Sequence, residues 1–138
     1  MSHAAVPTFH SLPFQDNFLL AALVQAGLPA RIVREIAEAL AVSPIQFAET
    51  IQIAPRTLMR RLSDNTLLKA DESERVLRVG RLLKRAEDVL ENEGEAALWF
   101  GHPLRALGGK TPLDMCATEP GAREVELVLG RLEHGVFG

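Results

Sequence analysis

The stretch from Pro44 to Leu62, PIQFAETIQIAPRTLMRRL, decides the fold. Each half opens on a proline, which suits the first turn of a helix, and Ser43 in front of the first half is a good helix cap. Apolar residues recur at helical spacing through both halves, at Phe47, Ala48, Ile51, Ile53, Leu58 and Leu62. Two short helices joined in this way are typical of a helix-turn-helix.

The second of these helices is basic, and its cationic side chains indicate nucleic-acid binding. Arginine forks onto guanine or phosphate, so we predict that DNA is contacted by Arg56, Thr57, Arg60 and Arg61. One position departs from the usual pattern, because Gln52 stands where the turn often has glycine, and a left-handed backbone costs energy there. An ordinary helical hairpin with an exposed basic face is the alternative.

The rest of the chain is also helical in pattern, and we predict an all-α protein. Asp16 or Asn17 caps a helix that Gly27 stops, and Asp71 with Glu74 resembles a capping box that opens a longer helix. No alternating strand pattern occurs. Residues 1–13 hold two prolines and no periodicity, so we expect a loose arm there, followed by a helix-turn-helix region at 14–70 and a second helical domain at 71–138.

Composition excludes several classes of protein. The 138 residues are 47% hydrophobic with a net charge of −3, which fits a folded domain and not a uniformly basic nucleic-acid coat. One cysteine fits a reducing cytoplasm, and no apolar run is long enough for a membrane span. The four histidines lack metal-site spacing, and Cys116 suits a core position better than a nucleophile. We therefore predict a cytoplasmic protein that is not an enzyme and holds no cofactor or metal.

Charge is nevertheless segregated along the chain. Residues 56–85 hold nine Lys or Arg and four Asp or Glu, a net charge of +5, whereas the remainder is net −8. The basic side chains that follow the helix-turn-helix, at Arg75, Arg78, Arg81, Lys84 and Arg85, recur at spacings of three and four. This flank is open to four interpretations: contact with DNA phosphates, pairing with the acidic residues at 87–95 of a neighbour, contact with an acidic partner, or a solvated face.

The C-terminal half resembles the toxin-binding domain of Xre, MbcA and ParS antitoxins, which belong to bacterial toxin–antitoxin pairs. The resemblance rests on Glu74-Arg75, Ala97-Leu98-Trp99, His102-Pro103, Ala106-Leu107-Gly108-Gly109, Thr111-Pro112-Leu113-Asp114, Thr118-Glu119, Gly121-Ala122, Val125, Leu129 and the run from Arg131 to Phe137. The preceding helices are similar to the Xre-like helix-turn-helix of the same proteins.

The resemblance implies a RES-domain toxin as the partner, an NAD⁺-consuming protein whose active site the antitoxin would occlude. It makes 71–138 a toxin-binding and dimerisation domain, and it implies autorepression by a homodimer on operator DNA. Apolar anchors and a negative tip at the chain end suit such an interface. We therefore predict toxin contacts by Leu132, Glu133, His134, Val136, Phe137 and Gly138. The alternative is a plain helix-turn-helix regulator whose C-terminal domain only dimerises.

Overall fold

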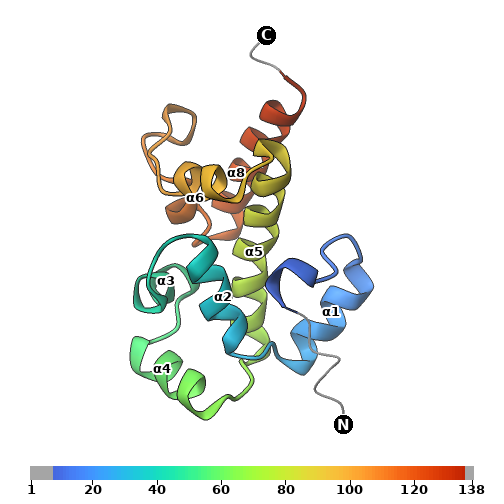
Figure 1. Ribbon diagram of the computed structural model, residues 1–138, viewed down its shortest axis with the longest axis vertical. Helices are drawn as coiled ribbons and strands as arrows, with labels where there is room; N and C mark the ends of the chain where they lie inside the picture. Colours follow the sequence, from blue (N-terminus) through green and yellow to red (C-terminus); the bar gives the residue numbers. More distant parts are fainter. Residues whose placement is uncertain (1–7, 136–138) are drawn as a thin grey trace. The chain divides into compact units, whose positions relative to one another are not determined.

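The structure is a computed structural model that describes residues 8–135, and it confirms the all-α prediction. Figure 1 shows the helices in chain order: η2 Phe9–Ser11, α1 Asn17–Ala26, α2 Arg31–Ala39, α3 Pro44–Ile51, α4 Pro55–Asp64, α5 Ala70–Leu90, α6 Glu93–Phe100, η3 Arg105–Leu107, α7 Pro112–Met115 and α8 Glu119–Glu133. Extended pairing within residues 8–135 is limited to two isolated bridges, Pro29 with Leu67 and Leu104 with Lys110. No helix in that range combines the length and hydropathy that crossing a bilayer requires.

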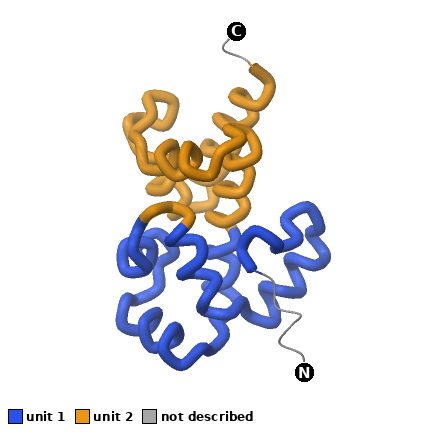
Figure 2. The backbone as a smooth tube through the Cα atoms, viewed as in Figure 1, with its two compact units in different colours: residues 1–38, 42–77 blue, residues 39–41, 78–138 orange. Residues whose placement is uncertain are grey.

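The chain forms two compact units (Figure 2). The first holds residues 1–38 and 42–77, and the second holds residues 39–41 and 78–138. Helix α5 contributes residues to both, since the division falls between Leu77 and Arg78. The helix-turn-helix lies in the first unit, whereas α6, η3, α7 and α8 lie in the second.

Local capping explains most helix boundaries. The Asp16 carboxylate accepts the Leu19 backbone N–H at the start of α1, and Ser43 forms a capping box with Gln46 at the start of α3. The predicted box at Asp71 and Glu74 is wrong in register. Helix α5 begins earlier, at Ala70, and the Glu72 carboxylate accepts the Lys69 backbone N–H instead (2.8 Å).

The core of the first unit includes a residue from the predicted arm. Phe9 is 1% exposed, and its backbone N–H donates to the Glu35 carboxylate at 2.7 Å. Leu12 is buried as well. The part of the predicted arm within the described residues is therefore packed, because Phe9 and Leu12 bury their apolar side chains in the core. The sequence did not predict this, since residues 1–13 show no helical or strand periodicity. Residues 1–7 lie outside the described residues.

The second unit is built on α8. This helix packs against α7 and η3, and α7 packs against α6. Gly121 allows the close approach of α7 and α8, since a Cβ atom there would lie 2.0 Å from the Met115 carbonyl oxygen. The apolar stripe of α8 fills the core with Val125, Val128 and Leu129. Only glycine fits at position 121, which fixes where the two helices meet.

Candidate nucleic-acid and protein interfaces

Helices α3 and α4 are joined by a tight turn whose backbone geometry the sequence alone did not determine. Gln52 adopts the left-handed conformation (φ 57°, ψ 44°), so the turn keeps the usual backbone geometry without glycine. Ala48 is fully buried at the crossing of the two helices, as its small side chain predicted. The next two N–H groups close the turn onto α3, Gln52 donating to the Glu49 carbonyl and Ile53 donating to the Ala48 carbonyl.

An arginine on α5 stabilises this turn. Arg75 Nε donates to the Ile51 carbonyl at 2.6 Å, and Arg75 Nη2 donates to the Gln52 carbonyl at 3.2 Å. Both carbonyls lie at the C-terminal end of α3, where backbone acceptors lack helical partners and carry partial negative charge. The guanidinium satisfies them and offsets the cost of a non-glycine residue in the left-handed region. We call this arrangement the Arg75 clamp.

The four residues predicted to contact DNA do not share one environment. Arg56 and Arg60 are exposed, one helical turn apart on α4, and neither forms an ion pair with any described residue. Thr57 is half-buried between them. A pair of unengaged guanidinium groups on the second helix of a helix-turn-helix has the right chemistry for phosphate or guanine.

Arg61 is directed differently from Arg56 and Arg60. Its guanidinium forms an ion pair with Glu72 on α5, and the two side chains are only 12% and 10% exposed. Because Glu72 also caps α5 at Lys69, this pair joins α4 to the start of α5. Removing one partner of a nearly buried ion pair strongly destabilises the fold, because the other charge is left buried without a partner. Arg61 therefore helps to hold α4 in position.

The basic flank on α5 pairs with acidic groups of the same chain. Within the second unit, three arginines of α5 face three glutamates of α8 spaced seven residues apart: Arg78 Nε with Glu119 at 3.5 Å, Arg81 Nη1 with Glu126 at 3.4 Å, and Arg85 with Glu126 at 3.6 Å and Glu133 at 3.1 Å. We call this set the α5–α8 ladder. Single exposed pairs contribute little, but a series along two helices fixes their register.

The C-terminal residues predicted to contact a toxin are only partly within the described residues. Leu132 is half-buried, and Glu133 and His134 are exposed at the end of α8. Glu133 already binds Arg85, so its carboxylate is held on the side of α8 that faces α5. Val136, Phe137 and Gly138 lie outside the described residues.

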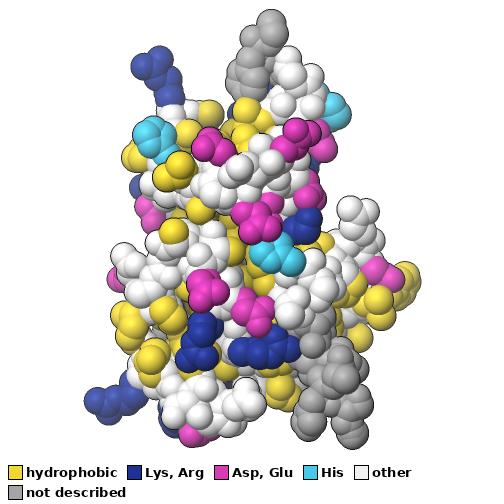
Figure 3. All heavy atoms as spheres, viewed as in Figure 1, with side chains coloured by type: hydrophobic (Ala, Val, Ile, Leu, Met, Phe, Trp, Pro, Cys, Tyr) yellow, Lys and Arg dark blue, Asp and Glu magenta, His cyan; other side chains and the backbone are white. Residues whose placement is uncertain are grey.

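Exposed apolar side chains mark the surface of the second unit. Leu98 on α6 is 71% exposed and Leu127 on α8 is 56% exposed. Trp99 is half-buried and stacks edge-on against the buried Phe100, with ring centroids 5.4 Å apart. Figure 3 shows hydrophobic, acidic and basic side chains interspersed on the face in view.

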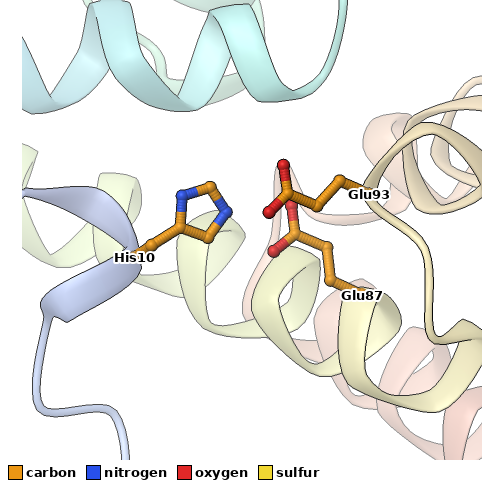
Figure 4. A group of neighbouring side chains, drawn as sticks. All are labelled: His10, Glu87 and Glu93. Carbon is orange, nitrogen blue, oxygen red and sulfur yellow. The ribbon is translucent and has the colours of Figure 1, made fainter.

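The thiol of Cys116 is buried, and burial decides its reactivity. Burial raises the pKa of the Cys116 thiol from 9.0 to about 12, against the opposing effect of Arg78 and Arg81, so the thiol stays protonated and is a poor nucleophile. Figure 4 shows Glu87 near the end of α5 and Glu93 at the start of α6. His10, drawn with them, belongs to the first unit, whereas Glu87 and Glu93 belong to the second.

These features define a class: a helix-turn-helix protein with a second helical unit that exposes several apolar side chains. Comparison with known families agrees. Residues 19–81 match the antitoxin Xre-like helix-turn-helix domain, and residues 85–135 match the antitoxin Xre/MbcA/ParS C-terminal toxin-binding domain.

Individual proteins are also similar over most of the chain. Antitoxin Xre of Photorhabdus laumondii subsp. laumondii is 36% identical over 85% of this chain and 80% of its own length. Antitoxin Xre of Yersinia enterocolitica is 31% identical over 91% of this chain and 86% of its own length. The Prs ADP-ribosylating antitoxin of a Sphingobium species is 27% identical over 83% of this chain and 78% of its own length. The chain belongs to the Xre antitoxin family, which is a family of antitoxins and not of enzymes.

Proposed function

We propose that the protein neutralises a RES-domain toxin that consumes NAD⁺, by occluding the active site of that toxin, and that it represses its own operon by binding operator DNA. The observation that carries the proposal is the presence, in one chain, of an Xre-like helix-turn-helix match at residues 19–81 and a toxin-binding domain match at residues 85–135. The helix-turn-helix match supports the proposed DNA binding, and the toxin-binding domain match supports the proposed toxin neutralisation.

The toxin-binding surface that we propose includes the end of α8 and the chain end beyond it. Leu132, Val136 and Phe137 supply apolar anchors, and Glu133, His134 and the carboxylate of Gly138 supply polar contacts. A nucleotide pocket holds cationic groups for substrate phosphates, and a carboxylate entering it competes for the same groups. Glu133 would then exchange Arg85 for a cationic group of the toxin.

Co-expression with a RES-domain toxin tests the toxin half, and the genes beside this one are the first place to look for that toxin. The intact chain should restore growth and cellular NAD⁺, and a chain lacking residues 133–138 should not. Glu133→Gln should weaken the complex measurably, whereas Glu124→Gln, a matched change at an exposed position of the same helix, should not. Full neutralisation by the truncated chain would refute the tail as the occluding element.

The chemistry of the toxin can be read in the same cells. One relative is named for ADP-ribosylation of Prs. Intact-protein mass spectrometry should therefore accompany the NAD⁺ measurement. Loss of NAD⁺ without an added ADP-ribose group on protein supports a toxin that degrades NAD⁺, and an added group identifies a toxin that transfers it.

For the DNA half, we propose contacts by Arg56, Thr57 and Arg60, with Arg61 holding α4 in place through Glu72. The double variant Arg56→Ala/Arg60→Ala leaves the Arg61 pair intact and so tests the surface without disturbing the fold. It should weaken promoter binding and reduce the salt-dependence slope by about 2, if each arginine contacts one phosphate. Arg34→Ala, at an exposed position on α2, is the control. An unchanged slope would place the DNA contacts elsewhere.

A further inference from the structure

Met59 is a large apolar residue on the surface of α4, beside the cationic residues of that helix. It is 43% exposed, whereas Leu58 and Leu62 of the same helix are buried in the core. It follows Arg56 by three positions and directly precedes Arg60, and all three residues are exposed. Figure 1 shows α4 at the edge of the first unit. An apolar side chain is therefore part of the surface that would face DNA.

We propose that Met59 recognises thymine by packing its side chain against the C5-methyl group of that base in the major groove. The inference rests on the proposed DNA binding by α4, and it adds the residue that gives this binding a sequence preference. The thymine methyl is an apolar group on the major-groove edge of a base pair, and apolar side chains contact it. Methionine suits such a contact, because its side chain is unbranched and its thioether is polarisable.

The charge around Met59 favours DNA as the occupant of this surface. Arg56 and Arg60 form no ion pair with any described residue, so both guanidinium groups are available to phosphate. A protein surface covering Met59 would have to desolvate these two charges or supply acidic partners for them. Phosphate contacts position a protein on the duplex but do not distinguish one base pair from another. A neighbouring side chain that meets the base edge supplies that distinction.

The helix that carries Met59 is held firmly, as recognition of a single methyl group requires. The ion pair between Arg61 and Glu72 joins α4 to the start of α5, and Arg75 binds the carbonyls of the turn that precedes α4. All of these residues belong to the first unit. Only the side chain of Met59 has to become ordered when DNA binds, so the entropy cost of the contact is small.

Replacement of thymine by deoxyuridine, which lacks only the C5-methyl group, tests the inference. The probe is a duplex selected from a random library by the unaltered protein, and fluorescence anisotropy at constant salt measures its affinity. Each thymine of the selected site is replaced in turn. At one position the replacement should weaken binding about 3- to 5-fold, the effect of losing one buried methyl contact.

Met59→Ala should abolish this difference between the two duplexes. The variant should bind the thymine duplex about 3- to 10-fold more weakly than the unaltered protein, with no further loss on the deoxyuridine duplex. Its fold should be retained, because position 59 is exposed and alanine has the highest helix propensity. Its salt slope should be unchanged, because no phosphate contact is lost.

Ile45→Ala is the matched control. Ile45 is also apolar and 47% exposed, but it lies on α3, and the first helix of a helix-turn-helix crosses the DNA backbone. This variant should keep the full difference between thymine and deoxyuridine. Loss of the difference in Ile45→Ala as well as in Met59→Ala would overturn the assignment to Met59.

The other outcomes separate this inference from the proposed repression. Equal affinity for thymine and deoxyuridine at every position, or a difference that persists in Met59→Ala, would overturn the inference and leave DNA binding intact. Failure to select any duplex would overturn both the inference and the DNA binding. Binding to the selected duplex without binding to the promoter of its own gene would refute only the repression.

Discussion

Replacing Arg75 with methionine removes the clamp on the helix-turn-helix and keeps an apolar stem that reaches about as far as Nε. Two hydrogen bonds from a charged donor are lost, to the carbonyls of Ile51 and Gln52, and the side chain that makes them is only 21% exposed. Bonds of this kind contribute about 1.5–3 kcal/mol each when intact. The Ile51 bond at 2.6 Å is the stronger, and water can replace part of the second.

We therefore expect Arg75→Met to lower the free energy of unfolding by about 2–4 kcal/mol. The ion pair with Asp71 adds little, because it is long (3.4 Å) and the Asp71 side chain is 70% exposed. Urea denaturation followed by circular dichroism measures the loss. Arg123→Met is the matched control, since its ion pair with Glu119 is exposed, and it should change stability by less than about 0.5 kcal/mol.

A second substitution tests the reason for the loss. Gln52→Gly removes the left-handed strain that the clamp offsets, and it should return about 1 kcal/mol to the Arg75→Met protein. If α4 binds DNA as proposed, Arg75→Met should weaken promoter affinity without changing the salt slope, because the Arg75 guanidinium is engaged with two backbone carbonyls at the end of α3. A loss of stability below about 1 kcal/mol, or no gain from glycine, would refute the clamp.

Three further outcomes follow from single residues. Arg56→Ala alone should lower the salt slope of promoter binding by about 1, as fluorescence anisotropy over a salt series can measure. Gly121→Ala should lower the free energy of unfolding by about 1–3 kcal/mol in a urea titration, because its methyl group meets the Met115 carbonyl. Cys116 should resist a thiol reagent at pH 8 until the protein is denatured. Its raised pKa also means that the thiol contributes to stability below pH 9.0 and that this contribution is lost as the pH rises toward 12, which thermal melts across that range would detect.

Sequence reasoning succeeded where the deciding interactions are local. Asp16 and Ser43 cap the helices that they precede, and the turn from α3 to α4 lies where Ile51 and Pro55 predicted it. Caps and prolines act within three or four residues, so a single stretch contains the whole signal. The family resemblance rested on short motifs of the same local kind, and both family matches confirm it.

Contacts between distant residues were missed for the opposite reason. Nothing near Gln52 indicates that Arg75, more than twenty residues away, would stabilise its turn. Phe9 looked like part of a loose arm because its partner Glu35 lies on another helix. The α5–α8 ladder is visible in the sequence. Its glutamates on α8 recur every seven residues, and its arginines on α5 recur at spacings of three and four. A comparison of charge periods between separate helices would have predicted it.

The continuity of α5 through both units limits how this protein can be cut. A fragment ending at Leu77 would stop in the middle of α5 and leave the last four carbonyls of the shortened helix without helical partners. The new end would lie two residues after Arg75, which stabilises the turn between α3 and α4. A fragment starting at Arg78 would lose the cap that begins the helix. A cut that keeps α5 whole has to fall beyond Leu90, so the arginine half of the ladder stays with the helix-turn-helix and the glutamate half goes with the second fragment.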